Sequence, residues 1–558
     1  MKNYNHIELF AGCGGLTLGL EKAGFSLTMA NELSPMAAET FAYNFFGENL
    51  EELANLKKPS KRVMWLTSNF DKKNLKSRLR ENPFLYPIMG EETNVVYSEV
   101  TDNFNDLNGN LIVGSIVELN KIINSPDNES KLAKLLRTGF NSPRGEVDLV
   151  SGGPPCQSFS MAGMRRKDCE KNILPFEFAK FVNVVRPRVV LLENVTGILR
   201  AFTQDGKKFH AWFEVAKVFA SFGYVPLCLH INARMVGVPQ NRPRFIMIAL
   251  RMDIYEQYTS TFIEGSADDI IFRPSLVFAE KVRKDIDSVK LSDIKYFDAM
   301  HEKDFELLSS SDVLAPLVSI PYGKAVSVKD AIDDLKEYNA SVSSNFVKNI
   351  NEMFQGILSR PKKELELQNH NFRTNSVLVK CRFRIYQILQ QIEVKLGHKE
   401  VTKAVLTIMK NDNETQLEET LWSELKEFVF MDKGGFPRSF NDKNDFIVYL
   451  SDFKTKKQTQ KALNAMEPAP ATLSIPDDAC HYDTDELRVL TVREMARIQS
   501  FPDDFIFRSK ITTGGQMRKF EVPQYTQVGN AVPPLLGMTL GKVIKNILNS
   551  VDKIAGFK

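Results

Sequence analysis

The sequence predicts an α/β protein built on a largely parallel β-sheet. Through the first 250 residues, short apolar runs rich in β-forming residues alternate with stretches of helical periodicity. The apolar runs are nearly continuous, as in strands that are buried on both faces. Glycine-rich or polar loops follow several of these runs, at the position where parallel sheets bind ligands.

We expect seven strands in this sheet, and each is justified by an apolar run with turn residues or helical patterns beside it. Helical periodicity follows the first run from Leu16 to Ala23, and the second run is followed by a helix that continues through Phe45. The strands are Ile7–Phe10, Ser26–Ala30, Leu111–Val113, Val147–Val150 and Val189–Leu192, with Tyr224–Asn232 and Phe245–Leu250 completing the sheet.

The chain divides into three ranges by pattern. Residues 1–254 form the first domain, and its polar, irregular stretch at about 48–108 is interpreted as a surface insertion. Helical patterns dominate 255–465, which we interpret as a separate domain. Residues 466–558 return to the first domain. In the later ranges we expect helices at Ser376–Leu396, Thr491–Ser500 and Pro534–Leu548, a capping box at Asn413 and Gln416, and a lone strand at Phe446–Leu450.

Composition excludes several classes of protein. The 558 residues have a net charge of +3, so a uniformly basic DNA-coating protein is excluded and any binding of nucleic acid must be local. No apolar run is long enough to span a bilayer, and the first strand begins too early for a signal peptide. The six cysteines are scattered without metal-ligand spacing, so we expect a reduced, cytoplasmic protein with no metal site.

A glycine-rich loop follows the first strand and precedes a helix. Gly12, Gly14 and Gly15 allow a ligand to approach the backbone closely above the helix N-terminus. Glu32 follows the second strand about 20 residues later, the usual position for an acid that binds ribose hydroxyls. A glycine-rich turn without a ligand is the alternative, but the acid favours a nucleotide-like ligand.

Two reactive residue types follow the next strands. Cys156 stands in a Gly/Pro/Ser loop, where a thiolate can act as a nucleophile, although a single cysteine is more often a small buried apolar residue. Glu193 ends the following apolar strand, and it is either a paired structural charge or a functional acid. We expect both to meet the glycine loop at one edge of the sheet.

The ordered motifs resemble those of DNA (cytosine-5) methyltransferases of the bacterial modification type. The resemblance covers about residues 7–250 and 465–545. It is carried by Ile7–Gly15, Gly153–Ser160, Glu193–Val195, Gln240–Arg244, Pro468–Pro476 with Arg488–Glu494, and Gln527–Pro534.

This resemblance implies a Rossmann-like, S-adenosylmethionine-dependent methyltransferase sheet with helices on both faces and a smaller target-recognition domain at 255–465. It implies that Cys156 adds to C6 of a flipped-out cytosine and that Glu193 stabilises the activated ring. Asn194 would orient the pocket, and Arg242 and Arg244 would hold the flipped nucleotide or the catalytic loop. For the two arginines, a solvated strand entry is the alternative.

The resemblance also implies binding residues. Those for the cofactor S-adenosylmethionine are Phe10, Ala11, Gly12, Cys13, Gly14, Gly15, Leu16, Glu32, Ser115, Ile116, Pro155, Leu174, Asn530, Ala531 and Val532. Those for DNA in the catalytic loop are Gln157, Ser158, Ser160, Arg165 and Arg166. In the recognition domain we expect Arg373, Arg382, Arg384 and Arg438.

The recognition-domain residues have structural alternatives. Arg382 and Arg384 alternate with aromatic residues, which suits phosphate contact with stacking but equally suits an amphipathic helix with its arginines outside. Arg438 lies in Gly434–Ser439, a candidate for a loop that enters a DNA groove.

Three departures from the family pattern stand out. Glu8 replaces the usual Asp of the first motif and is expected to keep its charge. Ser115 stands where an Asp usually contacts the adenine amine, and Lys171-Asn172 replaces an Arg-Gly pair.

We therefore expect a DNA cytosine-5 methyltransferase, a nucleoid-associated monomer that acts on double-stranded DNA. It would protect DNA in a restriction–modification system with a cognate endonuclease and without membrane contact. Two alternatives are an RNA cytosine-5 methyltransferase and a catalytically silent DNA-binding protein. The intact Ser158-Phe159-Ser160 and the long variable domain weigh against the first, and Cys156 with Glu193 weighs against the second.

Overall fold

The structure is a computed structural model. It describes residues 4–91, 95–101, 103–124, 129–155, 173–204, 207–360, 366–397, 400–410, 417–453, 460–471 and 474–556. The expected capping box at Asn413 and Gln416 lies outside these residues.

A nine-stranded sheet forms the centre of the molecule, with the order β12-β9-β11-β6-β5-β1-β2-β4-β3. Neighbouring strands are parallel except at β11, which runs antiparallel to both β6 and β9. All seven predicted strands belong to this sheet. Their bounds are β1 Tyr4–Leu9, β2 Phe25–Glu32, β4 Asn110–Val113, β5 Leu149–Gly152, β6 Val189–Val195, β9 Tyr224–Asn232 and β11 Pro243–Arg251.

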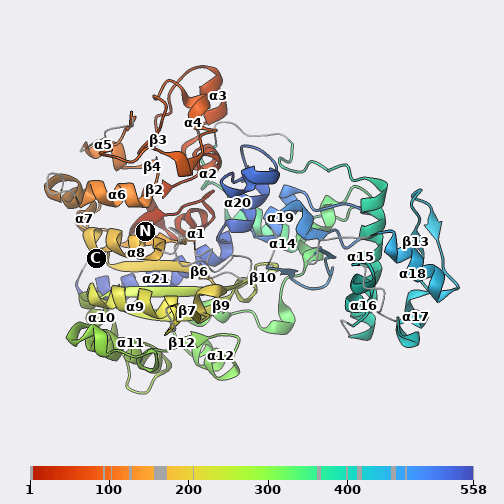
Figure 1. Ribbon diagram of the computed structural model, residues 1–558. Helices are drawn as coiled ribbons and strands as arrows, with labels where there is room; N and C mark the ends of the chain where they lie inside the picture. The colour runs from red at the N-terminus through yellow and green to blue at the C-terminus, as the bar shows by residue number, and fades with distance from the viewer. Residues whose placement is uncertain are drawn as a thin grey trace.

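Helices cover both faces of the sheet, as predicted (Figure 1). One row packs α6 (Ile116–Ile123), α8 (Leu174–Val185), α9 (Ala211–Ser221) and α11 (Ala267–Lys284) side by side. The other row packs α1 (Gly15–Ala23), α21 (Pro534–Ile554) and α10 (Met252–Thr259).

The C-terminal helix lies directly against the first helix, although more than 500 residues separate them. A Cβ atom at Gly19 of α1 would stand 2.4 Å from the backbone nitrogen of Met538, and one at Gly541 of α21 would stand 2.6 Å from Cβ of Ala23. Glycine on both helices therefore allows their backbones to approach closely. This packing brings the end of the chain to the glycine loop after β1.

The predicted surface insertion is partly a component of the sheet. It contains α3 (Leu50–Asn55), β3 (Val63–Trp65), α4 (Leu75–Arg78) and α5 (Phe104–Leu107). Strand β3 pairs in parallel with β4 and forms one edge of the sheet, and Trp65 is buried there. The sequence did not reveal this strand because three residues are too few to show a period.

The separate domain begins later than residue 255. Strand β12 (Tyr296–Asp298) pairs with β9 as the other edge of the sheet. Helices α12 (Glu302–Ser309), α13 (Val328–Ile332) and α14 (Asn345–Met353) contribute to the apolar core of the sheet, as do Ile271 and Phe278 of α11. These helices were assigned to a second domain because periodicity does not reveal which core an apolar face joins.

A second apolar core lies beyond residue 377. It is built from α15 (Val377–Leu396), α16 (Glu400–Ile408), α17 (Glu419–Leu425), α18 (Lys443–Ser451) and the hairpin of β13 (Phe430–Met431) and β14 (Pro437–Arg438). We name this unit the helical domain; Figure 1 shows it at the right, away from the sheet.

The prediction of a lone strand at Phe446–Leu450 is wrong, because these residues lie within α18. Phe446, Tyr449 and Leu450 have helical spacing and pack together in the core of the helical domain. A five-residue apolar run does not distinguish a strand from a buried helical turn.

The C-terminal segment also carries α19 (Val492–Ile498) and α20 (Gln524–Asn530), both ahead of α21. Helix α19 begins at a capping box between Thr491 and Glu494. Among the described residues, no helix combines the length and apolar character needed to cross a membrane.

Candidate active site

The glycine loop and Glu32 come together as predicted from their places in the chain. Phe10, Gly12 and Gly14 all have positive φ, so the backbone turns sharply between β1 and α1. The Gly12 N–H donates to Oε2 of Glu32 (2.8 Å), and the Ser34 N–H donates to Oε1 (2.8 Å). Glu32 therefore fixes the loop after β1 to the start of α2 (Pro35–Phe41).

Beneath this loop lies Glu8, which the Thr17 hydroxyl contacts at 2.5 Å. Burial raises the pKa of Glu8 to about 8, against a small opposing effect of this hydrogen bond. The carboxyl group is therefore largely neutral at pH 7. The expectation that Glu8 keeps its charge is wrong, because no cation among the described residues lowers this pKa.

The end of β4 forms a second side of the site. The Asn31 amide donates to the carbonyls of Ile112 (2.9 Å) and Gly114 (3.1 Å), which joins the ends of β2 and β4. The Ser115 hydroxyl caps α6 by accepting from the Val117 N–H (3.2 Å). The hydroxyl expected to bind the cofactor amine is thus already engaged as a helix cap.

Several other predicted cofactor residues face the protein with their side chains. Ala11, Cys13, Leu16 and Ile116 are buried, and the Cys13 thiol lies 3.7 Å from the Gln527 carbonyl. These residues shape the loops, while only their backbones are available to a ligand on that side. Leu174 lies at the first position of α8.

The C-terminal segment closes the glycine loop. A Cβ atom at Gly15 would meet the Val532 carbonyl at 2.4 Å and Cβ of Ala531 at 3.3 Å, so Ala531 and Val532 lie beside it, and Asn530 precedes them at the end of α20. Arg242 holds this segment, because its Nη2 donates to the carbonyls of Gly529 (2.7 Å) and Ala531 (3.0 Å).

Glu193 lies at the carboxyl end of β6, next to the end of β5. Arg244 Nε stands 2.7 Å from Glu193 Oε1, and both side chains are buried. A Cβ atom at Gly153 would stand 2.9 Å from Glu193 Oε2, so any other residue at this position would displace the carboxylate. The Asn194 amide donates to the Pro154 carbonyl (2.9 Å), which joins the ends of the two strands.

Among the described residues, the buried charges around Glu193 are two arginines and this one carboxylate. Burial lowers the pKa of Arg242 well below its ordinary value, and Arg244 adds to the decrease while Glu193 opposes it. Burial also lowers the pKa of Arg244, against the attraction of Glu193. Arg242 Nε is buried without a hydrogen-bond partner in the described part of the chain. The alternative interpretation, a solvated strand entry, is therefore wrong for both arginines.

The predicted nucleophile Cys156 lies outside the described residues, as do Gln157, Ser158, Ser160, Arg165 and Arg166. The last described residue before them is Pro155, which is exposed. Because Asn194 holds Pro154, the backbone is fixed two residues before Cys156.

The arginines of the helical domain lie at its surface or at its junctions. Arg373 is exposed ahead of α15, and Arg382 and Arg384 are half-buried on α15 between the buried Cys381, Phe383 and Ile385. The amphipathic-helix alternative is therefore correct for the buried Phe383, but the two arginines are only partly exposed, and burial lowers the pKa of Arg384.

Arg438 lies on β14 in the hairpin of the helical domain. Its guanidinium covers the ring of Phe440 at 4.6 Å and stands 3.7 Å from Asp445. Phe436, two residues earlier, is exposed over 69% of its surface. The hairpin therefore presents a cation and an aromatic ring to solvent.

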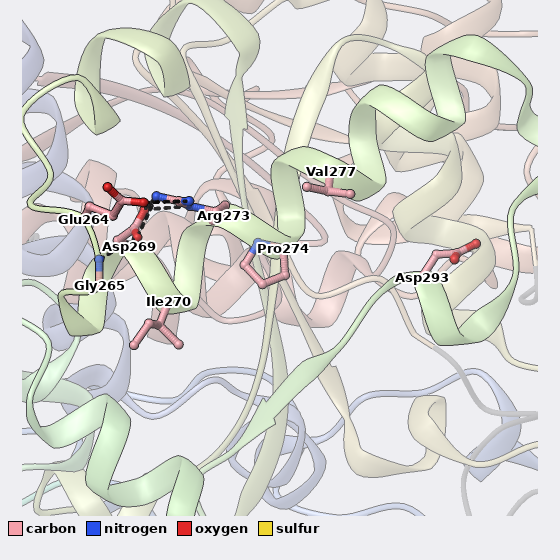
Figure 2. Close-up of a pocket in the computed structure, with 8 residues that line it drawn as sticks. All are labelled: Glu264, Gly265, Asp269, Ile270, Arg273, Pro274, Val277 and Asp293. Atoms are coloured by element: carbon pink, nitrogen blue, oxygen red, sulfur yellow. Dashed lines mark hydrogen bonds and ion pairs between the residues drawn. The ribbon is translucent and has the colours of Figure 1, made fainter.

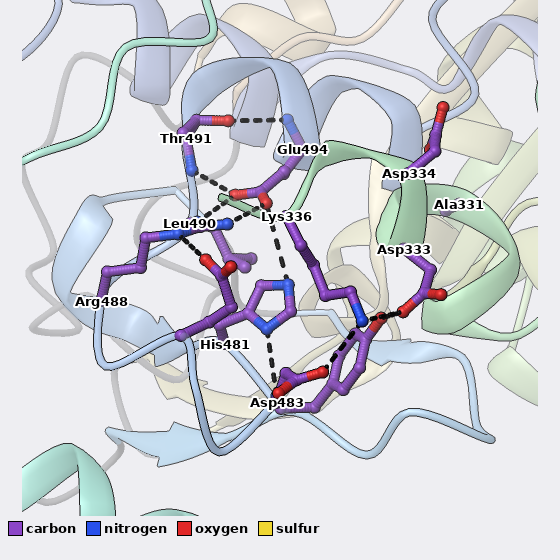
Figure 3. Close-up of polar contacts among 12 residues, drawn as sticks. Ala331, Asp333, Asp334, Lys336, His481, Asp483, Arg488, Leu490, Thr491 and Glu494 are labelled. Atoms are coloured by element: carbon purple, nitrogen blue, oxygen red, sulfur yellow. Dashed lines mark hydrogen bonds and ion pairs between the residues drawn. The ribbon is translucent and has the colours of Figure 1, made fainter. Parts of the chain in front are cut away.

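Sequence reasoning missed a buried polar network between α13 and α19 (Figure 3). Glu494 accepts two hydrogen bonds from Arg488 (2.8 Å each) and one from the Thr491 N–H (2.7 Å). Lys336 contacts Asp333 (3.2 Å) and Asp483 (3.0 Å). Burial lowers the pKa of His481 to about 4, so this side chain is neutral.

Gln387 joins this network to the helical domain. Its buried amide donates to the carbonyls of His481 (3.0 Å), Asp483 (2.6 Å) and Glu486 (3.4 Å). The available sequence signal was a polar residue within the apolar run Ile385–Leu389 of α15. One side chain of α15 thereby fixes the helical domain to the segment that carries α19.

A surface hollow of about 490 Å³ lies on α11, and none of the described site residues lines it (Figure 2). Arg273 forms a bidentate pair with Asp269, with contacts of 2.8 Å from Nη2 to both carboxylate oxygens. The hollow is lined by Glu264, Gly265, Asp269, Ile270, Arg273, Pro274, Val277 and Asp293.

The chain belongs to the C-5 cytosine-specific DNA methylase family, whose model matches residues 4–64 and 118–546. It is 24% identical to the type II methyltransferase M.Bpa9945I of Bacillus paralicheniformis, over 97% of this chain and 99% of that one. It is 23% identical to M.DdeI of Desulfomicrobium norvegicum, over 99% and 90%.

Among solved structures, the Dnmt2 methyltransferase of S. pombe matches with a TM-score of 0.34 and 14% identity, over 98% of this chain and all of that one. The family assignment confirms the predicted resemblance. The protein is a DNA cytosine-5 methyltransferase of the bacterial modification type.

Proposed function

We propose that the protein transfers a methyl group from S-adenosylmethionine to C5 of a cytosine flipped out of a specific duplex DNA sequence. The reaction proceeds through a covalent bond between Cys156 Sγ and C6 of the base. The observation that carries this proposal is the joined end of β5 and β6, where Glu193 stands beside Gly153 and Asn194 holds the Pro154 carbonyl, two residues before Cys156.

The residues suit the chemistry because C5 of cytosine is a weak carbon nucleophile. Addition of the Cys156 thiolate to C6 makes C5 electron-rich, and Glu193 stabilises the resulting charge at N3 and the exocyclic amine. Bound S-adenosylmethionine supplies a sulfonium methyl group for C5. Loss of the C5 proton to a base then allows the C6–S bond to break, which restores the thiolate.

The glycine loop fits an adenosyl cofactor. A Cβ atom at Gly12 would have no heavy atom within 4 Å, so the space beside this residue is open. Glu32 brings a carboxylate to the same loop, where ribose hydroxyls are suitable donors. Asn530 is exposed at the facing end of α20. These residues would hold the ribose and the methionine end.

We assign positioning roles to the two buried arginines. Arg244 holds the Glu193 carboxylate through its ion pair, which leaves Oε2 on the side of Gly153. Arg242 holds the Gly529–Ala531 backbone against the site. Their excess positive charge favours an anionic group in the pocket, such as the phosphate of the flipped nucleotide.

The helical domain is our candidate for target recognition, together with the catalytic loop that carries Arg165 and Arg166. Arg373 and the hairpin with Arg438 offer cations for phosphate contact. We further propose that the enzyme acts as a monomer in the nucleoid, where it protects DNA beside a cognate endonuclease.

Duplex DNA substituted with 5-fluorocytosine tests the mechanism, because fluorine at C5 cannot leave as a proton and the covalent complex persists. With S-adenosylmethionine present, the wild type should form an adduct that survives denaturing electrophoresis. Cys156→Ser should abolish it, whereas Cys169→Ser, in the same segment, should retain it. A wild type without an adduct, or an adduct in Cys156→Ser, would contradict the mechanism.

A further inference from the structure

The stretch of chain between β3 and β4 forms most of the insertion predicted at about 48–108, and we call it the addition. The family model matches residues 4–64 and resumes at 118, so this stretch lies in an unmatched range that also contains β4 and Ser115. This stretch leaves β3 at the carboxyl end of the strand, which is the edge of the sheet that carries the glycine loop and Glu32. Figure 1 shows it above β4 and beside α2.

Buried polar contacts give this addition a defined shape. Glu81 accepts from the Ser68 hydroxyl (2.6 Å) and from the backbone and side chain of Asn69 (2.8 Å each). Arg78 is buried, pairs with Glu99 (2.8 Å) and covers the Trp65 ring at 5.2 Å. Buried charge pairs require a defined geometry, so this segment is a folded part of the domain.

Within the addition, Phe84–Met89 is held at three points. The Leu85 carbonyl accepts from the Asn69 amide (2.9 Å). The Tyr86 hydroxyl contacts the Leu33 carbonyl (3.5 Å), and the Met89 N–H donates to Glu118 Oε2 (3.2 Å). Leu33 directly follows Glu32, and Glu118 lies two residues after Ile116. The segment therefore spans the ends of β2 and β4.

The segment that makes these contacts with Leu33 and Glu118 also exposes apolar side chains. The exposed fractions are 47% for Phe84, 68% for Leu85 and 42% for Ile88. Apolar groups gathered at the rim of a ligand site are suited to cover a flat aromatic ring. The ligand group expected at the ends of β2 and β4 is the adenine of the cofactor.

We propose that Phe84–Met89 forms the outer wall of the adenine subsite, with Leu85 and Ile88 covering the purine ring. This inference rests on the proposed function, since it concerns the same cofactor site. It gives the added stretch a role in cofactor affinity. The wall acts on the adenosine part of the ligand and leaves the amino-acid part to the glycine loop.

Calorimetric titration of the full-length protein with S-adenosylhomocysteine tests this wall. Leu85→Ser/Ile88→Ser should raise Kd about tenfold, the effect expected for one medium-sized apolar contact. The matched control is Ile263→Ser/Val277→Ser, which changes two exposed apolar residues by the hollow on α11 and should leave Kd unchanged. 5′-Methylthioadenosine, which lacks the amino-acid part, should lose affinity by the same factor.

The outcomes separate the two proposals. A wild type that does not bind S-adenosylhomocysteine contradicts the proposed cofactor. A wild type that binds it, with an unchanged Kd in the folded double variant, overturns the wall. An affinity loss for S-adenosylhomocysteine without one for 5′-methylthioadenosine also overturns it. If the double variant lacks the wild-type melting transition, Leu85→Ser alone tests the same expectation.

Discussion

The two ends of the central sheet both bury arginines, but they balance the charge differently. At the amino ends of β5 and β6, Arg188 contacts Asp148 (3.1 Å) and Asp552 (2.7 Å). Burial alone would lower the pKa of Arg188, but the attraction of the two carboxylates outweighs it and raises the pKa. At the carboxyl ends, Arg242 and Arg244 share Glu193, and both pKa values are lowered.

This difference separates a structural pair from a reaction site. At the amino end, Asp552 joins α21 to the sheet, and the carboxylates of Asp148 and Asp552 balance the buried charge of Arg188. At the carboxyl end, the surplus of buried positive charge lowers the stability of the folded protein. Such a cost is typical of a reaction site. Changes at the two ends should therefore affect different measurements.

The largest effect is expected at the carboxyl end. Glu193→Gln keeps the shape of the side chain but removes the proton-sharing carboxyl, so methyl transfer to duplex DNA should fall by about 10²–10⁴-fold. Incorporation of label from S-adenosylmethionine measures this rate. Glu264→Gln, an exposed control, should match the wild type. Label that enters tRNA but not duplex DNA would contradict the assigned substrate.

The amino end should respond in stability. Asp552→Asn leaves Arg188 with one buried carboxylate partner fewer, so the free energy of unfolding should fall by about 3–5 kcal/mol. Denaturant titration measures the loss. Asp253→Asn, in an exposed pair with Arg251, should cost less than about 1 kcal/mol. Equal losses for both variants would remove the distinction between the two ends.

A smaller effect is expected at the junction with the helical domain. Gln387→Leu removes the donor to three carbonyls, so the helical domain loses its fixed position and KM for duplex DNA should rise about tenfold. The Kd for S-adenosylhomocysteine should not change. Gln391→Leu, exposed one turn later on α15, is the matched control. A shift in cofactor affinity would indicate general unfolding instead.

The smallest effect concerns Glu8. Its pKa is about 8 in the folded state, so between pH 4.5 and 8 the folded protein keeps a proton that the unfolded chain releases. The folded state then binds more protons, and stability falls as pH rises through this range. Glu8→Gln should reduce this loss in the free energy of unfolding by ~1–3 kcal/mol. The melting temperature of both proteins is measured between pH 5 and pH 8. If it depends on pH in the same way in the wild type and in Glu8→Gln, Glu8 is ionised in the folded state.

The sequence was sufficient to predict where residues that directly follow a strand lie. The glycine loop, Glu32 and Glu193 each follow a buried strand directly, and parallel strands bring such positions to one edge. Contacts between distant segments were not predictable. Nothing in the pattern indicates that Arg242 holds Gly529, or that Gln387 reaches His481, because both depend on how separate units pack.

The sequence pattern also did not reveal the edge strands of the sheet or which apolar core a helix joins. Strands β3 and β12 have three residues each, and they join the sheet only because the strand beside each of them, β4 or β9, has free backbone groups. Helix α11 has the same amphipathic pattern whether it covers a sheet or begins another domain. The choice depends on the surface that its apolar face meets.

Bisulfite sequencing of DNA from cells that express the protein tests the central claim most directly. The wild type should convert cytosine to 5-methylcytosine in one short sequence context. Glu193→Gln should leave this context unmethylated while it still binds S-adenosylhomocysteine. Unmethylated DNA from cells with folded wild-type protein, or equal methylation by Glu193→Gln, would contradict the reaction site assigned to the carboxyl end of the sheet.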